Sequence, residues 1–204
     1  MPRDKTETHS RIVEAAKAEF LQYGFADASM RRIAANAGIQ VGGLYKHFAN
    51  KEEMFEALVE SAAKGFYELY SQIEGEYFGE IEKIDESYAW EGLDETVRAM
   101  EYMYDHIDEF TLIVTKSRGT KYESFTHDVA KLEEEVSLRY MEELKKAGLQ
   151  VKEVDRTEFH LLVTAYTYAV IQPVSHGFNK AEALHFAATL EEFYKPAWKA
   201  LFGI

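Results

Sequence analysis

The sequence has no cysteine and only three prolines. Without cysteine, a disulfide framework and a thiolate metal site are excluded, and the chain suits the reducing cytoplasm. The first residues, MPRDKTETHS, are polar and lack the apolar core of a signal peptide. No stretch approaches the roughly 18 uninterrupted apolar residues of a membrane span. We therefore expect a cytoplasmic protein with no membrane partner.

Positive charge is also scarce, and it is unevenly placed. The chain carries 23 Lys+Arg against 36 Asp+Glu, a formal net charge of −13. Through Lys51, however, eight basic residues outnumber five acidic ones. A positive first quarter joined to an acidic remainder indicates two parts with different partners, the first attractive to a phosphate backbone. The excess is small enough to arise by chance, so it only supports other observations.

Apolar residues recur at helical spacing almost throughout, and no strand-like alternation is present. Gly24 is expected to stop the first helix, and Asn50 with Glu53 forms a capping pair for a long fourth helix. Pro173 and Pro196 are expected to kink or end their helices. The predicted fold class is all-α, with a small N-terminal unit (residues 1–50) and a larger helical body (residues 51–204). Helices are expected over about 12–23, 29–37, 40–48, 51–79, 93–104, 107–117, 125–144, 159–174 and 186–201.

Three short helices in about 40 residues, the second and third joined by a tight glycine turn, describe a helix-turn-helix unit. Gly42 and Gly43 each cost roughly 1 kcal/mol of helix stability relative to alanine, so they need a reason. A surface without side chains at these positions lets the third helix approach DNA bases or backbone closely. Gln40 suits adenine, and Val41 suits the thymine methyl group.

Other side chains and backbone groups of this unit suit phosphates. Tyr45, His47 and Lys51 can donate to phosphate oxygens, as can the N–H groups at the start of the second helix near Ser29. The complete set of residues predicted to bind DNA is Ser29, Met30, Arg31, Gln40, Val41, Gly42, Gly43, Tyr45, Lys46, His47 and Lys51.

This N-terminal quarter resembles the TetR-type (tetracycline-repressor-like) transcriptional regulators. The matching elements are IVEAAKAEFLQYGF, MRRIAANAGI and GGLYKHFANKEEMF. The resemblance implies a homodimer that binds a pseudo-palindromic DNA operator, represses transcription and is released by a small-molecule effector bound in the helical body. It also implies a four-helix dimer interface made by the last two long helices. The candidate interface residues are Phe159, Leu162, Tyr166, Phe186, Leu190 and Phe193.

Effector-contacting residues are expected among the aromatic and soft side chains of the body, although ordinary core packing explains any one of them equally well. An aromatic or amphipathic effector is favoured over a highly charged one. A cationic effector is an alternative, but most acidic residues of the body, such as Glu133, are expected on solvated helix surface. The candidate pocket residues are Phe66, Tyr70, Trp90, Tyr102, Met103, Phe110, Phe125 and Tyr166.

Two other classes of function remain open. A helical enzyme is disfavoured because no nucleophile motif, phosphate loop or HExxH pattern is present, so we expect no enzymatic activity and no cofactor. The histidines show no ligand spacing with a carboxylate, and we expect no metal site. A helix-turn-helix used for protein contacts is the second alternative, and salt-dependent DNA binding separates it from a regulator.

Overall fold

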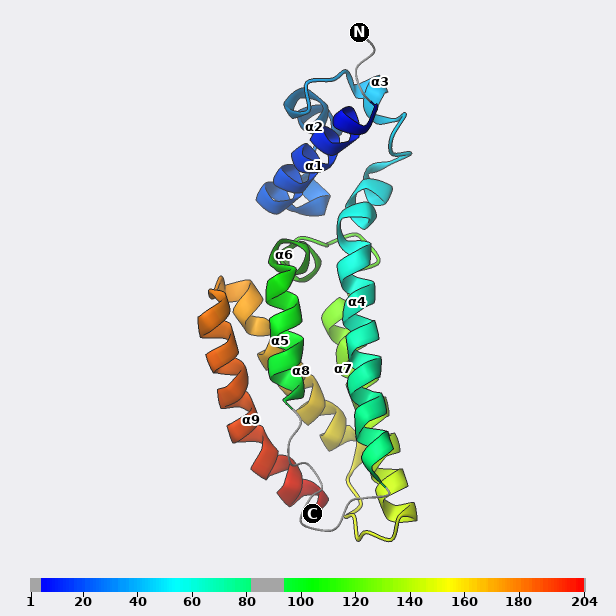
Figure 1. Cartoon of the computed structure of the whole chain (residues 1–204), viewed down its shortest axis with the longest axis vertical. Helices are drawn as coiled ribbons and strands as arrows, with labels where there is room; N and C mark the ends of the chain where they lie inside the picture. The colour runs from blue at the N-terminus through cyan, green and yellow to red at the C-terminus, as the bar shows by residue number, and fades with distance from the viewer. Residues whose placement is uncertain (1–4, 82–93, 204) are drawn as a thin grey trace. The chain divides into compact units, whose positions relative to one another are not determined.

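The computed structural model describes residues 5–81 and 94–203, and Trp90 lies outside these ranges. Within them the chain is all-α, with nine helices and no strand (Figure 1). The all-α prediction is thus confirmed. None of the helices described is long and apolar enough to cross a membrane. The bounds are α1 Lys5–Asp27, α2 Met30–Asn36, α3 Val41–Leu44, α4 Lys51–Glu80, α5 Glu95–Asp105, α6 Ile107–Thr115, α7 Phe125–Lys146, α8 Arg156–His176 and α9 Lys180–Phe202.

Contacts group the chain into two compact units. The first contains the residues up to Lys64 together with His106–Phe125, and the second contains Gly65–Asp105 and the residues from Thr126 onward. The first unit therefore adds α6 and the beginning of α4 to the helices expected within residues 1–50. Helix α4 is the element that continues from one unit into the other.

The core of the first unit follows the apolar stripe of α1. Ile12 and Phe20 of α1 and Ile33 of α2 are fully buried, and Leu44 of α3 joins them. The ring of Phe20 also meets Phe55 of α4 edge-on, with centroids 5.2 Å apart. These contacts hold the short helices, which are too short to be stable alone in water.

Glycines and polar caps, rather than prolines, set the helix ends. Gly24 leaves the helical conformation (φ 75°), as expected, and Asn50 Oδ1 accepts from the Glu53 N–H at 2.8 Å. Of the two outcomes expected for the prolines, a kink or a helix end, the helix end does not occur. Pro173 and Pro196 lie inside α8 and α9, and each helix ends instead at a left-handed glycine, Gly177 or Gly203.

Helix α3 is shorter than the predicted range of residues 40–48. Only Val41–Leu44 is α-helical. The chain then continues in tight turns, in which the N–H groups of His47 and Phe48 both donate to Leu44 O, at 2.9 and 3.1 Å. Two glycines in four residues weaken the helix, and the buried Leu44 side chain fixes its position instead.

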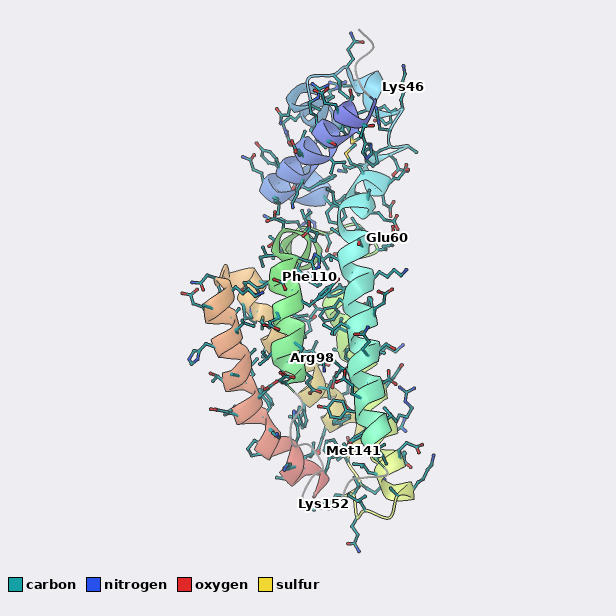
Figure 2. The ribbon with its side chains drawn as sticks, viewed as in Figure 1. Lys46, Glu60, Arg98, Phe110, Met141 and Lys152 are labelled. Carbon is teal, nitrogen blue, oxygen red and sulfur yellow. The ribbon has the colours of Figure 1, made fainter. Side chains whose placement is uncertain are left out.

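The second unit packs the far part of α4 with α5, α7, α8 and α9. Phe159 of α8 and Phe202 of α9 are 1% exposed, and their rings meet edge-on with centroids 5.5 Å apart. Met141 of α7 belongs to the same core, and Lys152 N donates to Phe202 O at 2.8 Å nearby (Figure 2). This cluster closes one end of the unit.

Candidate nucleic-acid interface and ligand cavity

A buried carboxylate joins α1 to the beginning of α2. Oε1 of Glu19, a residue only 3% exposed, accepts from Ser29 N at 2.7 Å and from Arg32 Nε at 2.8 Å. The Arg32 guanidinium also donates to Asp27 O and stacks over the Tyr23 ring. Burial alone would raise the pKa of Glu19, but the hydrogen bonds from Arg32 and Ser29 lower it overall. The hydrogen bonds that Glu19 accepts from Ser29 and Arg32 therefore fix the direction of α2 relative to α1.

The residues predicted to read DNA bases lie on an exposed segment. Gln40, Gly42 and Lys46 are exposed, and Tyr45 is 52% exposed. Arg31 of α2 is exposed as well, and the remaining predicted residues are half-buried, namely Ser29, Met30, Val41, Gly43, His47 and Lys51. No acidic residue occurs between Asp27 and Glu52, so no carboxylate belongs to this segment.

The two glycines of α3 have no internal packing requirement. A Cβ at Gly42 would meet no atom within 4 Å, and one at Gly43 would lie 3.7 Å from Ile39 Cδ1, an ordinary contact. Neither residue has a positive φ. The fold itself therefore does not explain why glycine stands at either position.

Two predicted phosphate contacts are engaged inside the protein. Lys51 Nζ donates to Ala26 O and Ala28 O at 3.2 and 3.3 Å and sits over the Phe25 ring. The Ser29 N–H donates to Glu19, and Ser29 Oγ caps α2. Sequence reasoning did not foresee the bonds of Lys51 or the bond from the Ser29 N–H to Glu19, because both depend on how α1 and α4 meet the start of α2.

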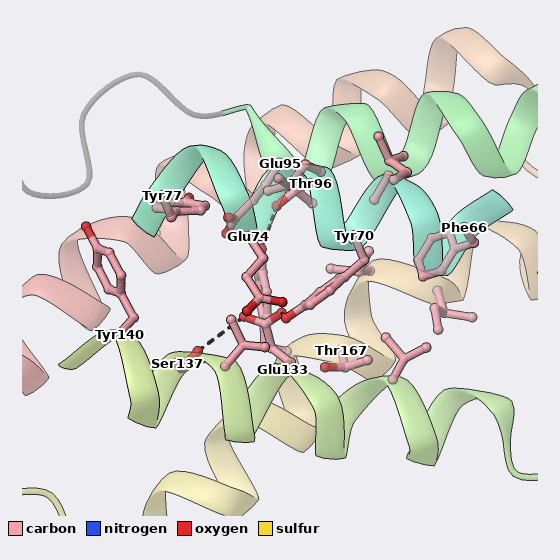
Figure 3. A pocket seen from close by; sticks show the side chains of 18 of the residues that line it. Phe66, Tyr70, Glu74, Tyr77, Glu95, Thr96, Glu133, Ser137, Tyr140 and Thr167 are labelled. Atoms are coloured by element: carbon pink, nitrogen blue, oxygen red, sulfur yellow. Dashed lines mark hydrogen bonds between the residues drawn. The ribbon is translucent and has the colours of Figure 1, made fainter. Parts of the chain in front are cut away.

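A cavity of about 110 Å³ lies within the second unit (Figure 3). It is framed by α4, α5, α7 and α8, and its wall is mainly apolar. Six aromatic side chains contribute to it, and three glutamates reach it as well. Its aromatic and acidic lining residues include Phe66, Tyr70, Tyr77, Tyr140, Tyr166, Glu74, Glu95 and Glu133.

The polar groups of the cavity bond mostly to one another. Tyr70 Oη donates to Glu133 Oε2 at 2.5 Å, and Ser137 Oγ donates to the other oxygen of the same carboxyl group at 3.3 Å. Burial, reinforced by the charge of Glu133, raises the pKa of Glu95 to about 8. Burial also raises the pKa of Glu133. The cavity thus holds carboxyl groups that resist ionisation.

The structure brings together only part of the predicted pocket. Phe66, Tyr70, Met103 and Tyr166 line the cavity, whereas Tyr102 packs against Phe66 without lining it. Phe110 and Phe125 instead meet edge-on in the core of the first unit, with centroids 5.9 Å apart.

The expectation that Glu133 lies on solvated helix surface is wrong, since it points into the cavity (Figure 3). Sequence reasoning also missed Glu95, Tyr77 and Tyr140. For Glu133 the sequence did contain a signal. This residue lies four positions after Val129 and three before Val136, which places it on the apolar side of α7.

The predicted dimer residues separate into two groups. Phe159 and Leu190 are 1% and 7% exposed in this chain's own core, and Tyr166 lines the cavity, so none of them forms an outward face. Leu162 is 43% exposed and Phe193 is 72% exposed. Phe186 is half-buried and meets the Phe178 ring.

The family model described as "Bacterial regulatory proteins, tetR family" matches residues 12–58, the part that carries the helix-turn-helix. Through these residues the chain is similar to the tetR family. Among curated TetR-type relatives, an HTH-type transcriptional regulator of Staphylococcus aureus (strain bovine RF122 / ET3-1) is 33% identical over 82 residues. The alignment covers 40% of this chain and 44% of that regulator, less than half of its length. A counterpart in strain USA300 matches equally well.

Solved structures of two regulators resemble most of this chain in fold. NalD, the secondary repressor of the MexAB-OprM multidrug efflux pump in Pseudomonas aeruginosa, is 17% identical, with a TM-score of 0.60 over 97% of this chain and 98% of that one. FadR from Bacillus subtilis in complex with stearoyl-CoA is 12% identical, with a TM-score of 0.54 over 90% and 95%. At these identities the likeness concerns the fold alone.

Proposed function

We propose that this TetR-family protein is a transcriptional repressor that binds a pseudo-palindromic DNA operator as a homodimer and is released by a small molecule held in the cavity of the second unit. The observation that carries the proposal is the exposed, acid-free segment containing Gln40, Tyr45 and Lys46. It acts on DNA and therefore in the cytoplasm.

The chemistry of this segment favours DNA over a protein partner. Gln40 can pair bidentately with adenine, Tyr45 and Lys46 can donate to phosphates, and Gly42 offers bare backbone. A surface that recognises proteins would usually centre on buried apolar anchors. Here Tyr45 is the large apolar side chain that the α3 region exposes.

The homodimer proposal rests on outward apolar side chains of α8 and α9. Leu161, Leu162 and Tyr168 of α8 are 63%, 43% and 46% exposed, and Phe193 of α9 is 72% exposed. Monomeric proteins rarely leave such groups together on adjacent helices without a partner. A dimer would also hold two helix-turn-helix units at a set spacing, about 34–36 Å for half-sites one turn apart.

Effector release requires the ligand to favour a conformation that does not fit the operator. Helix α4 lines the cavity with Phe66 and Tyr70 and begins in the unit that contains the helix-turn-helix. A shift of α4 would therefore reach the DNA-binding unit, with a coupling of about 1–3 kcal/mol. The structural likeness to a repressor, NalD, and to FadR holding stearoyl-CoA supports both parts of this proposal.

Fluorescence anisotropy with a labelled DNA fragment from upstream of the protein's own gene tests the DNA-binding step. We expect affinity to fall steeply with salt, by about 0.9 log units per log unit of salt for each phosphate contacted. Tyr45→Ala and Lys46→Ala should weaken binding at least about tenfold, and Lys46→Ala should reduce the salt slope by about one.

Lys131→Ala is the matched control, because it removes the same charge from an exposed position of α7. It should leave DNA affinity unchanged. Salt-insensitive binding, or equal losses in the Lys46 and Lys131 variants, would favour the helical protein-interaction module instead.

A further inference from the structure

The cavity contains more acidic groups than its own wall can pair with basic ones. Among the described residues that line it, three are glutamates and none is lysine, arginine or histidine. Glu74 forms an ion pair with Arg139, so its charge is balanced. In the described part of the chain, no lysine or arginine forms a comparable ion pair with Glu95 or Glu133.

Glu95 and Glu133 come from different helices but share one location. Both line the main cavity, and both also line an adjoining cavity of about 20 Å³ together with Ser137 and Tyr166. Two carboxyl groups of α5 and α7 thus face the same space (Figure 3). Their mutual repulsion and burial keep the proton on at least one of them when the cavity contains only water.

Aromatic faces surround these carboxyl groups. Tyr70 and Tyr77 approach from α4, Tyr140 from α7 and Tyr166 from α8. An aromatic face attracts an organic cation through its quadrupole, most strongly where water is excluded. The cavity therefore combines the two features that recognise a quaternary or protonated amine, namely carboxyl groups without a basic partner in the wall and several aromatic faces.

We propose that the cavity binds a lipophilic organic monocation, with its ammonium group facing Glu95 and Glu133 and its aromatic or branched body against the tyrosines. This inference rests on the proposed role of the cavity as an effector site and names the ligand class. The sequence favours an aromatic or amphipathic effector over a highly charged one, and the proposed ligand corresponds to the cationic alternative.

Binding of such a cation displaces a proton. The Glu95 carboxyl group, protonated in the empty site, becomes a carboxylate that pairs with the ammonium, and the proton passes to solvent. The groups that act on Glu95 from the packed helices are Tyr70 and Tyr77 of α4, Glu133 of α7, Tyr166 of α8, and Glu191 and Lys195 of α9. Only Lys195 among them favours the charged form by its own charge.

Three probes with the same phenol ring separate the ligand classes. These are (4-hydroxyphenyl)trimethylammonium, its neutral isostere 4-tert-butylphenol, and the anion 4-hydroxybenzenesulfonate. Isothermal titration calorimetry at pH 7 should show the cation binding at least about tenfold tighter than the neutral phenol. The sulfonate should bind weakest. Titrations in phosphate and in Tris, whose ionisation enthalpies differ, should show release of up to one proton with the cation only.

Glutamine variants test the assignment of the carboxyl groups. Glu95→Gln and Glu133→Gln should each remove most of the preference for the cation, and Glu95→Gln should abolish proton release. The controls are Glu101→Gln on α5 and Glu135→Gln on α7, both exposed positions on the same helices. They should retain the wild-type preference. Thermal melting confirms that each variant is folded.

Equal or tighter binding of the neutral phenol, cation preference that survives in both cavity variants, or no cation binding at millimolar concentration would each overturn the proposal. The titrations contain no DNA, so they are independent of operator binding. Operator binding without cation preference would overturn only this inference, and cation preference without operator binding would overturn the regulatory function.

Discussion

The backbone N–H of Ser29 donates a 2.7 Å hydrogen bond to Oε1 of Glu19. This contact joins α1 to the beginning of α2. Glu19 also receives the Arg32 guanidinium, with Nη2 at 2.6 Å from the same oxygen. A buried acid thus sets the direction of α2 within the N-terminal segment through Lys51, where basic residues outnumber acidic ones.

Replacing Glu19 by glutamine should destabilise the protein by about 1–3 kcal/mol, because Arg32 and the Ser29 N–H lose their charged acceptor. Urea unfolding followed by circular dichroism measures this. Since the folded-state pKa of Glu19 is lowered from 4.5, its contribution is present above pH 4.5 and is lost as pH falls through the folded-state pKa. Glu14→Gln, at an exposed position of the same helix, should change neither quantity. Equal stability of the two variants would contradict this role.

Gly42→Ala and Gly43→Ala should raise stability slightly while weakening DNA binding. Both positions have room for a methyl group, and alanine favours a helix over glycine by up to about 1 kcal/mol. If DNA approaches this backbone, the same methyl group keeps it away and lowers operator affinity. Gly75→Ala in α4, where a Cβ would also meet nothing within 4 Å, is the control and should leave affinity unchanged. Unchanged affinity in both α3 variants would show that the glycines serve another purpose.

Phe193→Glu and Leu161→Glu should convert a dimer into monomers, because each places a charge on an apolar face that the partner would bury. Sedimentation velocity over a range of protein concentrations measures the oligomeric state. Lys131→Glu, on exposed α7, should remain dimeric. If the wild-type protein proved to be a monomer, the proposal of an operator with two half-sites would lose its basis.

The stability of the ligand-free protein should decrease as pH rises from 4.5 toward 8. Glu95 has a folded-state pKa of about 8, raised from 4.5, so the folded state holds a proton that the unfolded state releases. Its contribution is fully present below pH 4.5 and is lost as pH passes 8. Glu95→Gln should flatten this dependence and be the more stable form at pH 9 by about 1–2 kcal/mol. Parallel curves for wild type and variant, measured by urea unfolding from pH 5 to 9, would rule out the proposed burial.

The sequence by itself determined the helical class, the helix-turn-helix and most helix positions. These follow from contacts within a few residues, such as the Asn50–Glu53 cap and the glycines at helix ends. The long fourth helix, expected over residues 51–79, is observed as Lys51–Glu80. Local propensity and apolar periodicity are sufficient for such features.

Tertiary structure decided which polar residues face inward. Glu133 belongs to an acidic run that reads as helix surface, yet it points into the cavity and receives the Tyr70 hydroxyl. Lys51 reads as a phosphate ligand but binds carbonyl groups at the end of α1. Both outcomes depend on contacts between residues far apart in the chain, which helical spacing does not encode. The character of the ligand cavity was therefore fixed by how the helices pack, not by the order of their residues.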